Sequence, residues 1–225
     1  MPVAAGDTAP ARGRGLRTIG GCHLFPLKLE KRLTAAEATK LAAADHDLCL
    51  FGLAELPADV VERLAPHRRR LTIVGPCAID DAAARGLAAH AGPVSVGGIA
   101  VESPELARKL LADSRRGSMS GVSAMSAEVA VLVCKLPNWT GDFGALQRLS
   151  PGVAEALVAA QKWNGQLPGV TAFENADSVA VAKALAKRQG PLALPNLKKI
   201  SPQTLSALIE KADVDIPLDR KSTRL

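Results

Sequence analysis

Apolar and polar positions follow a pattern that recurs about every 23 residues along the chain. LCLFGLAEL (48–56), LTIVGPCAI (71–79) and LALPNLKKI (192–200) align without gaps, and VSVGGI (94–99) matches their first six positions. The first and third positions are apolar and the second is often small or polar, which is the period of two of a short β-strand. The fifth position is mostly glycine, which tolerates a positive φ and predicts a tight turn after each strand. Seven full units have as fifth positions Gly52, Gly75, Gly98, Gly121, Ala145, Gly169 and Asn196.

A helix pattern follows each strand pattern. The tenth position is often a residue that caps helix N-termini, and proline follows it in several units, where its missing N–H is harmless. Thr34 and Glu37 have the spacing of a capping box. Apolar residues then recur about four positions apart, which predicts one apolar face on a short helix. The expected caps are Thr34, Asp80, Ser103, Ser126, Ser150 and Ser201, and the prolines are Pro104, Pro151 and Pro202.

One unit of this size cannot bury its apolar side alone, whereas stacked copies bury a continuous core. QLPGVTAF (166–173) and LALPNLKKI (192–200) share one phrase, with Pro168 and Pro195 in the same place, and DIP (215–217) begins it again. In these segments the unit resembles the leucine-rich repeats, most closely the 23-residue BspA-like class.

The resemblance covers about residues 25–218 and weakens toward the N-terminus, where other residues replace the motif's proline. It implies an α/β fold, a leucine-rich-repeat solenoid with short parallel strands on the concave face and short helices on the convex face. Seven to eight units in register are strong evidence for an architecture and poor evidence for a particular function. The residues at the proline position of the departing units are Phe51, Val74, Gly97 and Ser120.

Charge divides the chain into three expected parts. The formal net charge is +6, yet the basic surplus lies near the two ends and the body between them is neutral. We expect a flexible basic leader over 1–24, a repeat array over 25–218 and a short tail over 219–225. A neutral body removes the main argument for nucleic-acid binding. We see neither a transmembrane segment nor a signal peptide, so we expect no membrane association and a cytoplasmic location.

The tail has an unusual sequence. DRKSTRL (219–225) matches the translation, in one reading frame, of a common sequencing-adapter DNA. We therefore expect these residues to be non-native and the natural protein to continue beyond Leu218. A solenoid that ended there would leave its last unit uncapped, so we also expect self-association through that C-terminal edge.

Residues capable of chemistry are present but do not form a recognisable site. The four cysteines lack paired or CxxC spacing and are expected to be free thiols. His67 and His90 lie 23 residues apart, which we interpret as a surface position near helix C-termini. Trp139 and Trp163 occupy equivalent places and are expected to pack between units. We predict no catalytic residues, no metal site and no cofactor, and hence no enzyme.

The expected function is non-catalytic protein–protein recognition or scaffolding. The alternative is a sensor or targeting array of a larger signalling or catalytic protein whose C-terminal part is missing. In either case an unknown protein partner is expected on the concave face, at the outward positions of the strands. The candidate contact residues are Phe51, Thr72, Val74, Ser95, Ser118, Ser120, Asp142 and Gln166.

Overall fold

A computed structural model describes residues 18–19, 22–24 and 32–217. The rest of the predicted leader and the tail at 219–225 lie outside the described residues. Thr18–Ile19 (β1) and Cys22–Leu24 (β2), which fall within that leader, form an antiparallel pair at the edge of a sheet. No helix in the described part of the chain is long and apolar enough to cross a membrane.

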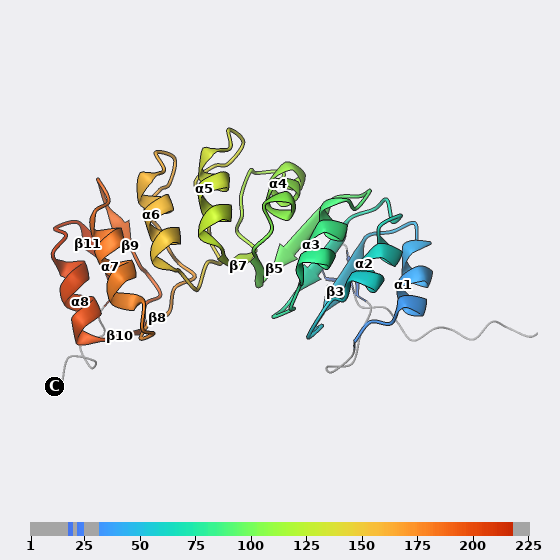
Figure 1. Ribbon diagram of the computed structural model, residues 1–225, viewed down its shortest axis with the longest axis horizontal. Coiled ribbons are helices and arrows are strands. Elements are labelled where there is room, and N and C mark those ends of the chain that lie inside the picture. The colour runs from blue at the N-terminus through green and yellow to red at the C-terminus, as the bar shows by residue number, and fades with distance from the viewer. Residues whose placement is uncertain (1–17, 20–21, 25–31, 218–225) are drawn as a thin grey trace, which may run out of the picture.

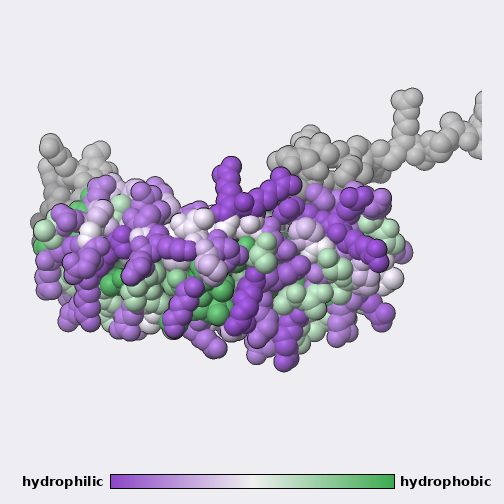
Figure 2. All heavy atoms as spheres, turned by 90° about the horizontal axis from the view of Figure 1, so that it is seen from above, coloured by the Kyte–Doolittle hydropathy of each residue, from purple (hydrophilic) through white to green (hydrophobic). Residues whose placement is uncertain are grey.

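Helices and short strands alternate along the chain, so the fold is α/β. The helices follow one another in sequence order along the length of the molecule (Figure 1), and each packs against the next. Seen from above, hydrophilic side chains are spread over the surface and hydrophobic residues show between them, most strongly near the middle of the molecule (Figure 2). The helices are α1 (Ala35–Ala42), α2 (Ala58–Leu64), α3 (Asp81–Ala88), α4 (Pro104–Asp113), α5 (Ala127–Lys135), α6 (Pro151–Ala159), α7 (Ser178–Ala186) and α8 (Pro202–Ile209).

The helix starts agree with the sequence prediction. All six expected caps accept a hydrogen bond from a backbone N–H in the first turn of their helix. Thr34 and Glu37 form the complete capping box. Proline occupies the first turn of α4, α6 and α8, as expected. Local hydrogen bonding therefore fixes where most of the helices begin.

The N-terminal half contains a regular sheet with the strand order β1-β2-β3-β4-β5. Strands β3 (Leu48–Phe51), β4 (Leu71–Val74) and β5 (Val94–Gly97) are parallel. Leu48 pairs with Leu71, which pairs with Val94, so neighbouring strands are offset by the 23 residues of the sequence pattern. The first and third residues of β3 and β4 are buried in the core, as the period of two predicts.

After β5 the strands no longer form one continuous parallel sheet, contrary to the prediction. Strands β6 (Ile99–Val101) and β7 (Val122–Met125) pair in parallel, as do β8 (Ala172–Phe173) with β10 (Lys199–Ile200), and β9 (Leu192–Ala193) with β11 (Val214–Asp215).

Turns replace several strands that the pattern predicts. The central turn residues include the pairs Pro168-Gly169 and Pro195-Asn196, whose preferences suit β-turns better than extended ladders. Ser118, Ser120 and Asp142 are therefore not on strands, contrary to expectation. The turns close with N–H to carbonyl bonds from Val122 to Met119 (3.0 Å), Leu146 to Phe143 (3.1 Å), Val170 to Leu167 (3.2 Å) and Leu197 to Leu194 (3.1 Å).

Candidate functional site

Four of the predicted contact residues lie together on β3, β4 and β5. Phe51 is the register partner of Val74, and Thr72 is the register partner of Ser95. Their side chains lie on the face of the sheet opposite the buried Leu and Ile side chains. Phe51 is 36% exposed, which makes it one of the few large apolar side chains on the described surface. These four residues are called the strand-side patch below.

The other predicted contact residues form separate local groups. The Ser118 hydroxyl donates to Asp142 (2.7 Å) and accepts from the Ser120 N–H (3.0 Å). Gln166 forms an isolated parallel bridge with Ala193. Ser118 and Asp142 thus already satisfy each other, which leaves this group less free to bind a partner than the strand-side patch.

The sheet of the N-terminal half ends at β5, and one edge of that strand has no strand partner among the described residues. Alternate residues of a parallel strand direct their backbone groups toward the same side. Gly75 donates to the Gly97 carbonyl (2.8 Å) on the β4 side, so Val94 and Val96 direct their backbone groups to the open edge. The N–H of Val94 is satisfied there by a carboxylate oxygen of Asp113 (2.8 Å).

The chain approaches this edge again at Gly121 without forming a strand. A Cβ at Gly121 would lie only 1.7 Å from the carbonyl oxygen of Val96, so no other residue fits without moving the backbone. Strand pairing resumes further along, between β6 and β7, with a register shift at Ile99/Ala100. The regular parallel ladder is therefore interrupted beside β5.

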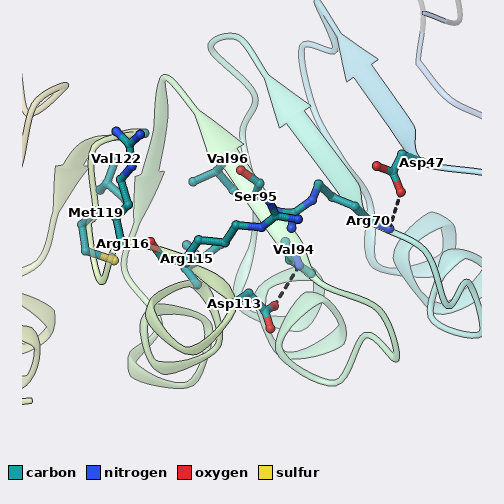
Figure 3. Close-up of a pocket in the computed structure, with 13 residues that line it drawn as sticks. Asp47, Arg70, Val94, Ser95, Val96, Asp113, Arg115, Arg116, Met119 and Val122 are labelled. Carbon is teal, nitrogen blue, oxygen red and sulfur yellow. Dashed lines mark hydrogen bonds between the residues drawn. The ribbon is translucent and has the colours of Figure 1, made fainter. Parts of the chain in front are cut away.

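A cavity of about 480 Å³ opens at this interruption. Arg70 and Arg115 reach toward each other from opposite sides, with Ser95 near their ends (Figure 3). Arg116 also lines the cavity. Within the described ranges, none of these three guanidinium groups has a hydrogen bond or ion pair. The cavity is thus bordered by three cationic groups that no described residue neutralises by direct pairing.

Two carboxylates also line the cavity, but both are engaged with the protein. Asp113 accepts from Val94 and forms an ion pair with Lys109 (3.2 Å). Asp47 accepts from the backbone N–H of Arg70 (3.2 Å). The Lys109 charge offsets that of Asp113. The lining then holds three arginines and one further carboxylate, Asp47, so it carries a net positive charge.

The position of the cavity coincides with a change in one column of residues. This column is the residue four positions before the first buried residue of each strand or turn. In the units on both sides of the cavity it is a histidine or a tryptophan whose exposed fraction is at most 3%. The equivalent residue of the intervening unit, four before Met119, is Arg115, which is exposed. The cavity lies beside the unit in which a charged side chain takes this place, between units that carry buried rings. The rings of the column are His67, His90, Trp139 and Trp163.

His67 and His90 correct the expectation of surface histidines, since both are buried. Their ring centroids lie 5.9 Å apart, and Nδ1 of His90 is within hydrogen-bond distance of the Gly92 backbone. Burial lowers the pKa of both histidines, because it disfavours the charged imidazolium form. The expectation failed because the two rings occupy the position that the buried Trp139 and Trp163 occupy in later units.

Trp139 and Trp163 are buried as expected, but other groups cover them. Trp139 packs against Phe143, with ring centroids 5.0 Å apart. The guanidinium of Arg188 lies 4.6 Å from the ring centroid of Trp163 and donates to that residue's carbonyl oxygen. The Trp163 contact joins two units, as expected, whereas the Trp139 contact lies within one unit.

The cysteines are only partly as predicted. Cys77 and Cys134 are free thiols, and burial raises their pKa to about 11 and about 12. Cys49 is disulfide-bonded, contrary to the expectation that it is free. Within the described ranges, no cluster of three or more His, Cys, Asp or Glu residues could hold a metal ion.

No protein-family model, curated protein or solved structure matches this sequence. The functional interpretation therefore depends on the site itself. Sequence reasoning identified Ser95 but missed Arg70, Arg115 and Arg116. The one signal that could have revealed them is the arginine at 115, in a column that holds rings in the neighbouring units.

Proposed function

We propose that this chain is a non-catalytic protein-recognition module, built as a solenoid of the leucine-rich-repeat type. The offset of 23 residues between paired strands and the sequential packing of the helices support stacked units. In such an array the strands line the concave face and the helices the convex face. The concave face is where we place the partner.

The observation that carries this proposal is the strand-side patch beside the arginine-lined cavity. Phe51 offers partly exposed aromatic surface next to Val74, while Thr72 and Ser95 add small polar groups in register. Burying a large apolar side chain contributes roughly 1.5–3 kcal/mol, and aromatic and arginine anchors dominate most interfaces. Phe51 and the cavity arginines are the anchors that this face provides.

Quantitative capture with matched baits tests the proposal. Tagged full-length chain is compared with a strand-side variant, Phe51→Ser/Val74→Ser, and with a helix-side control, Val131→Ser. Val131 is the better control because it is also an exposed apolar residue, at 42%, but lies on α5. Circular dichroism first confirms that all three baits fold.

We expect proteins retained by the wild-type chain to be lost from the strand-side variant and kept by the helix-side control. Equal retention by all three baits, or loss only from the helix-side control, would place binding elsewhere and refute the proposal.

A further inference from the structure

We propose that the cavity beside β5 binds an extended segment of the partner protein, through a phosphorylated side chain on that segment. This inference rests on the proposed function and deepens it by giving the chemistry of the partner. Three features carry it: unpaired arginines that face each other, a net positive charge, and an open strand edge.

The first feature is the arrangement of the guanidinium groups. Arg70 and Arg115 come from different units and point toward each other across Ser95 (Figure 3), although like charges repel. Neither group has a counter-ion among the described residues. A phosphate between them accepts hydrogen bonds from both guanidiniums in the paired geometry that arginine favours. The Ser95 hydroxyl borders the same space and offers a further donor.

The second feature is the charge balance of the cavity. The guanidiniums of Arg70 and Arg115 share the space beside Ser95, whereas that of Arg116 lies apart from them, near Val122, and Asp47 lies by the Arg70 backbone (Figure 3). Lys109 compensates Asp113 at 3.2 Å. The two positive charges of Arg70 and Arg115 match a phosphate monoester, which carries about −1.5 to −2 near neutral pH. One carboxylate side chain would leave part of this positive charge unpaired.

The third feature is the open edge of β5. Val94 and Val96 direct their backbone groups to this edge. Asp113 accepts a hydrogen bond from the Val94 N–H but not from the Val96 N–H. Gly121 covers the Val96 carbonyl and accepts from the Gly98 N–H (2.8 Å). The Val96 N–H and the Val94 carbonyl are left, and one residue of a bound extended segment can pair with both, as in peptide recognition at a sheet edge. The cavity volume of about 480 Å³ lies within the roughly 300–1,000 Å³ of ligand pockets. It holds a modified side chain together with adjoining backbone.

An oriented peptide library tests the inference without knowledge of the natural partner. The immobilised full-length chain is offered peptide pools with degenerate flanks and a fixed central phosphoserine, glutamate or serine. We expect selective retention of the phosphoserine pool. The retained sequences are then synthesised with a fluorescent label, and their affinity is measured by anisotropy.

Substitutions then assign the binding to the cavity. We expect Arg70→Gln and Arg115→Gln each to weaken binding of the selected phosphopeptide about tenfold or more. Arg148→Gln is the matched control, since Arg148 is exposed and lies outside the cavity, and we expect it to leave the affinity unchanged. We also expect slower amide exchange at Val96 in the complex.

Several results would overturn the inference. Retention of no pool, equal retention of the glutamate pool, or equal binding by the Arg70→Gln and Arg115→Gln variants would each contradict it. Tighter, arginine-dependent binding of a single-stranded oligonucleotide would replace the peptide by a nucleic acid. If capture still depends on Phe51 while the phosphopeptide fails, the proposed function stands and only this inference falls. If the phosphopeptide binds but capture is independent of Phe51, the phosphate site stands and recognition through the strand-side patch falls.

Discussion

A methyl group at Gly141 should destabilise the chain far more than the same methyl group at Gly190. Both glycines have nearly the same positive φ, +87° and +90°. Alanine in this conformation costs about 1–2 kcal/mol of strain, partly offset by about 0.4–1 kcal/mol from the reduced entropy of the unfolded chain. These two contributions are common to both positions and cancel in a comparison.

The two positions differ in what the new methyl group meets. At Gly141 a Cβ would lie 2.0 Å from the backbone oxygen of Lys162, in the turn before the next unit, whereas at Gly190 it meets nothing within 4 Å. Real Cβ atoms almost never come closer than 3.0 Å to such a neighbour. The backbones of adjacent units must therefore separate, at an overpacking cost of about 1–3 kcal/mol.

Urea unfolding followed by circular dichroism measures this difference. The free energy of unfolding, extrapolated to water, should be about 1–3 kcal/mol lower for Gly141→Ala than for Gly190→Ala. Equal values, or a larger loss at Gly190, would show that the close approach of the two turns does not limit stacking.

Three further predictions concern groups outside the cavity. Because burial lowers the pKa of His67 and His90 below the ordinary 6.5, the unfolded chain binds more protons than the folded chain as pH falls. Unfolding free energy should therefore decrease below about pH 6.5, by up to about 1.4 kcal/mol per pH unit for each histidine, and a double His→Leu variant should lose this dependence. Ser150→Ala removes the oxygen that caps α6 and should cost about 1 kcal/mol in thermal or urea unfolding. Cys77 and Cys134 have raised pKa values of about 11 and about 12, so iodoacetamide at pH 8 should alkylate the native thiols at least about a hundredfold more slowly than a free peptide thiol; rapid alkylation would contradict their burial.

The sequence predicted best what depends on local interactions. Helix starts such as Thr34 and Ser103 depend on one side chain and the first turn, so their spacing alone located them correctly. The strands β3 to β5 were located correctly because their first and third residues are apolar and their second is smaller or polar.

The prediction failed where segments with similar patterns of apolar residues adopt different backbone conformations, a strand in one unit and a turn in another. In LTIVG (71–75) a strand runs on to a glycine turn, whereas LPGV (167–170) closes a turn of its own. Aligning the two by their apolar positions hid this difference, although the Pro-Gly pair in the second was the available signal. Ser118, Ser120 and Asp142 were misassigned to strands for this reason.

The arginine-lined cavity depends on long-range structure. Arg70 and Arg115 are 45 positions apart in the sequence, and they meet because the ladder stops at β5. The ladder stops where Gly121 approaches the Val96 carbonyl, a contact that no local pattern reveals. His67 and His90 were misplaced for a related reason, since their burial is decided by how neighbouring units pack.

Recognition through the strand side is the central claim, and hydrogen exchange of the captured complex tests it most directly. Mass-spectrometric exchange would be recorded for the full chain alone and with its purified partner. We predict slower exchange over β3, β4, β5 and residues 114–122, and no change over the outer faces of α2 to α6. Protection confined to the helices, with unchanged exchange over β3 to β5, would contradict recognition by the strand side.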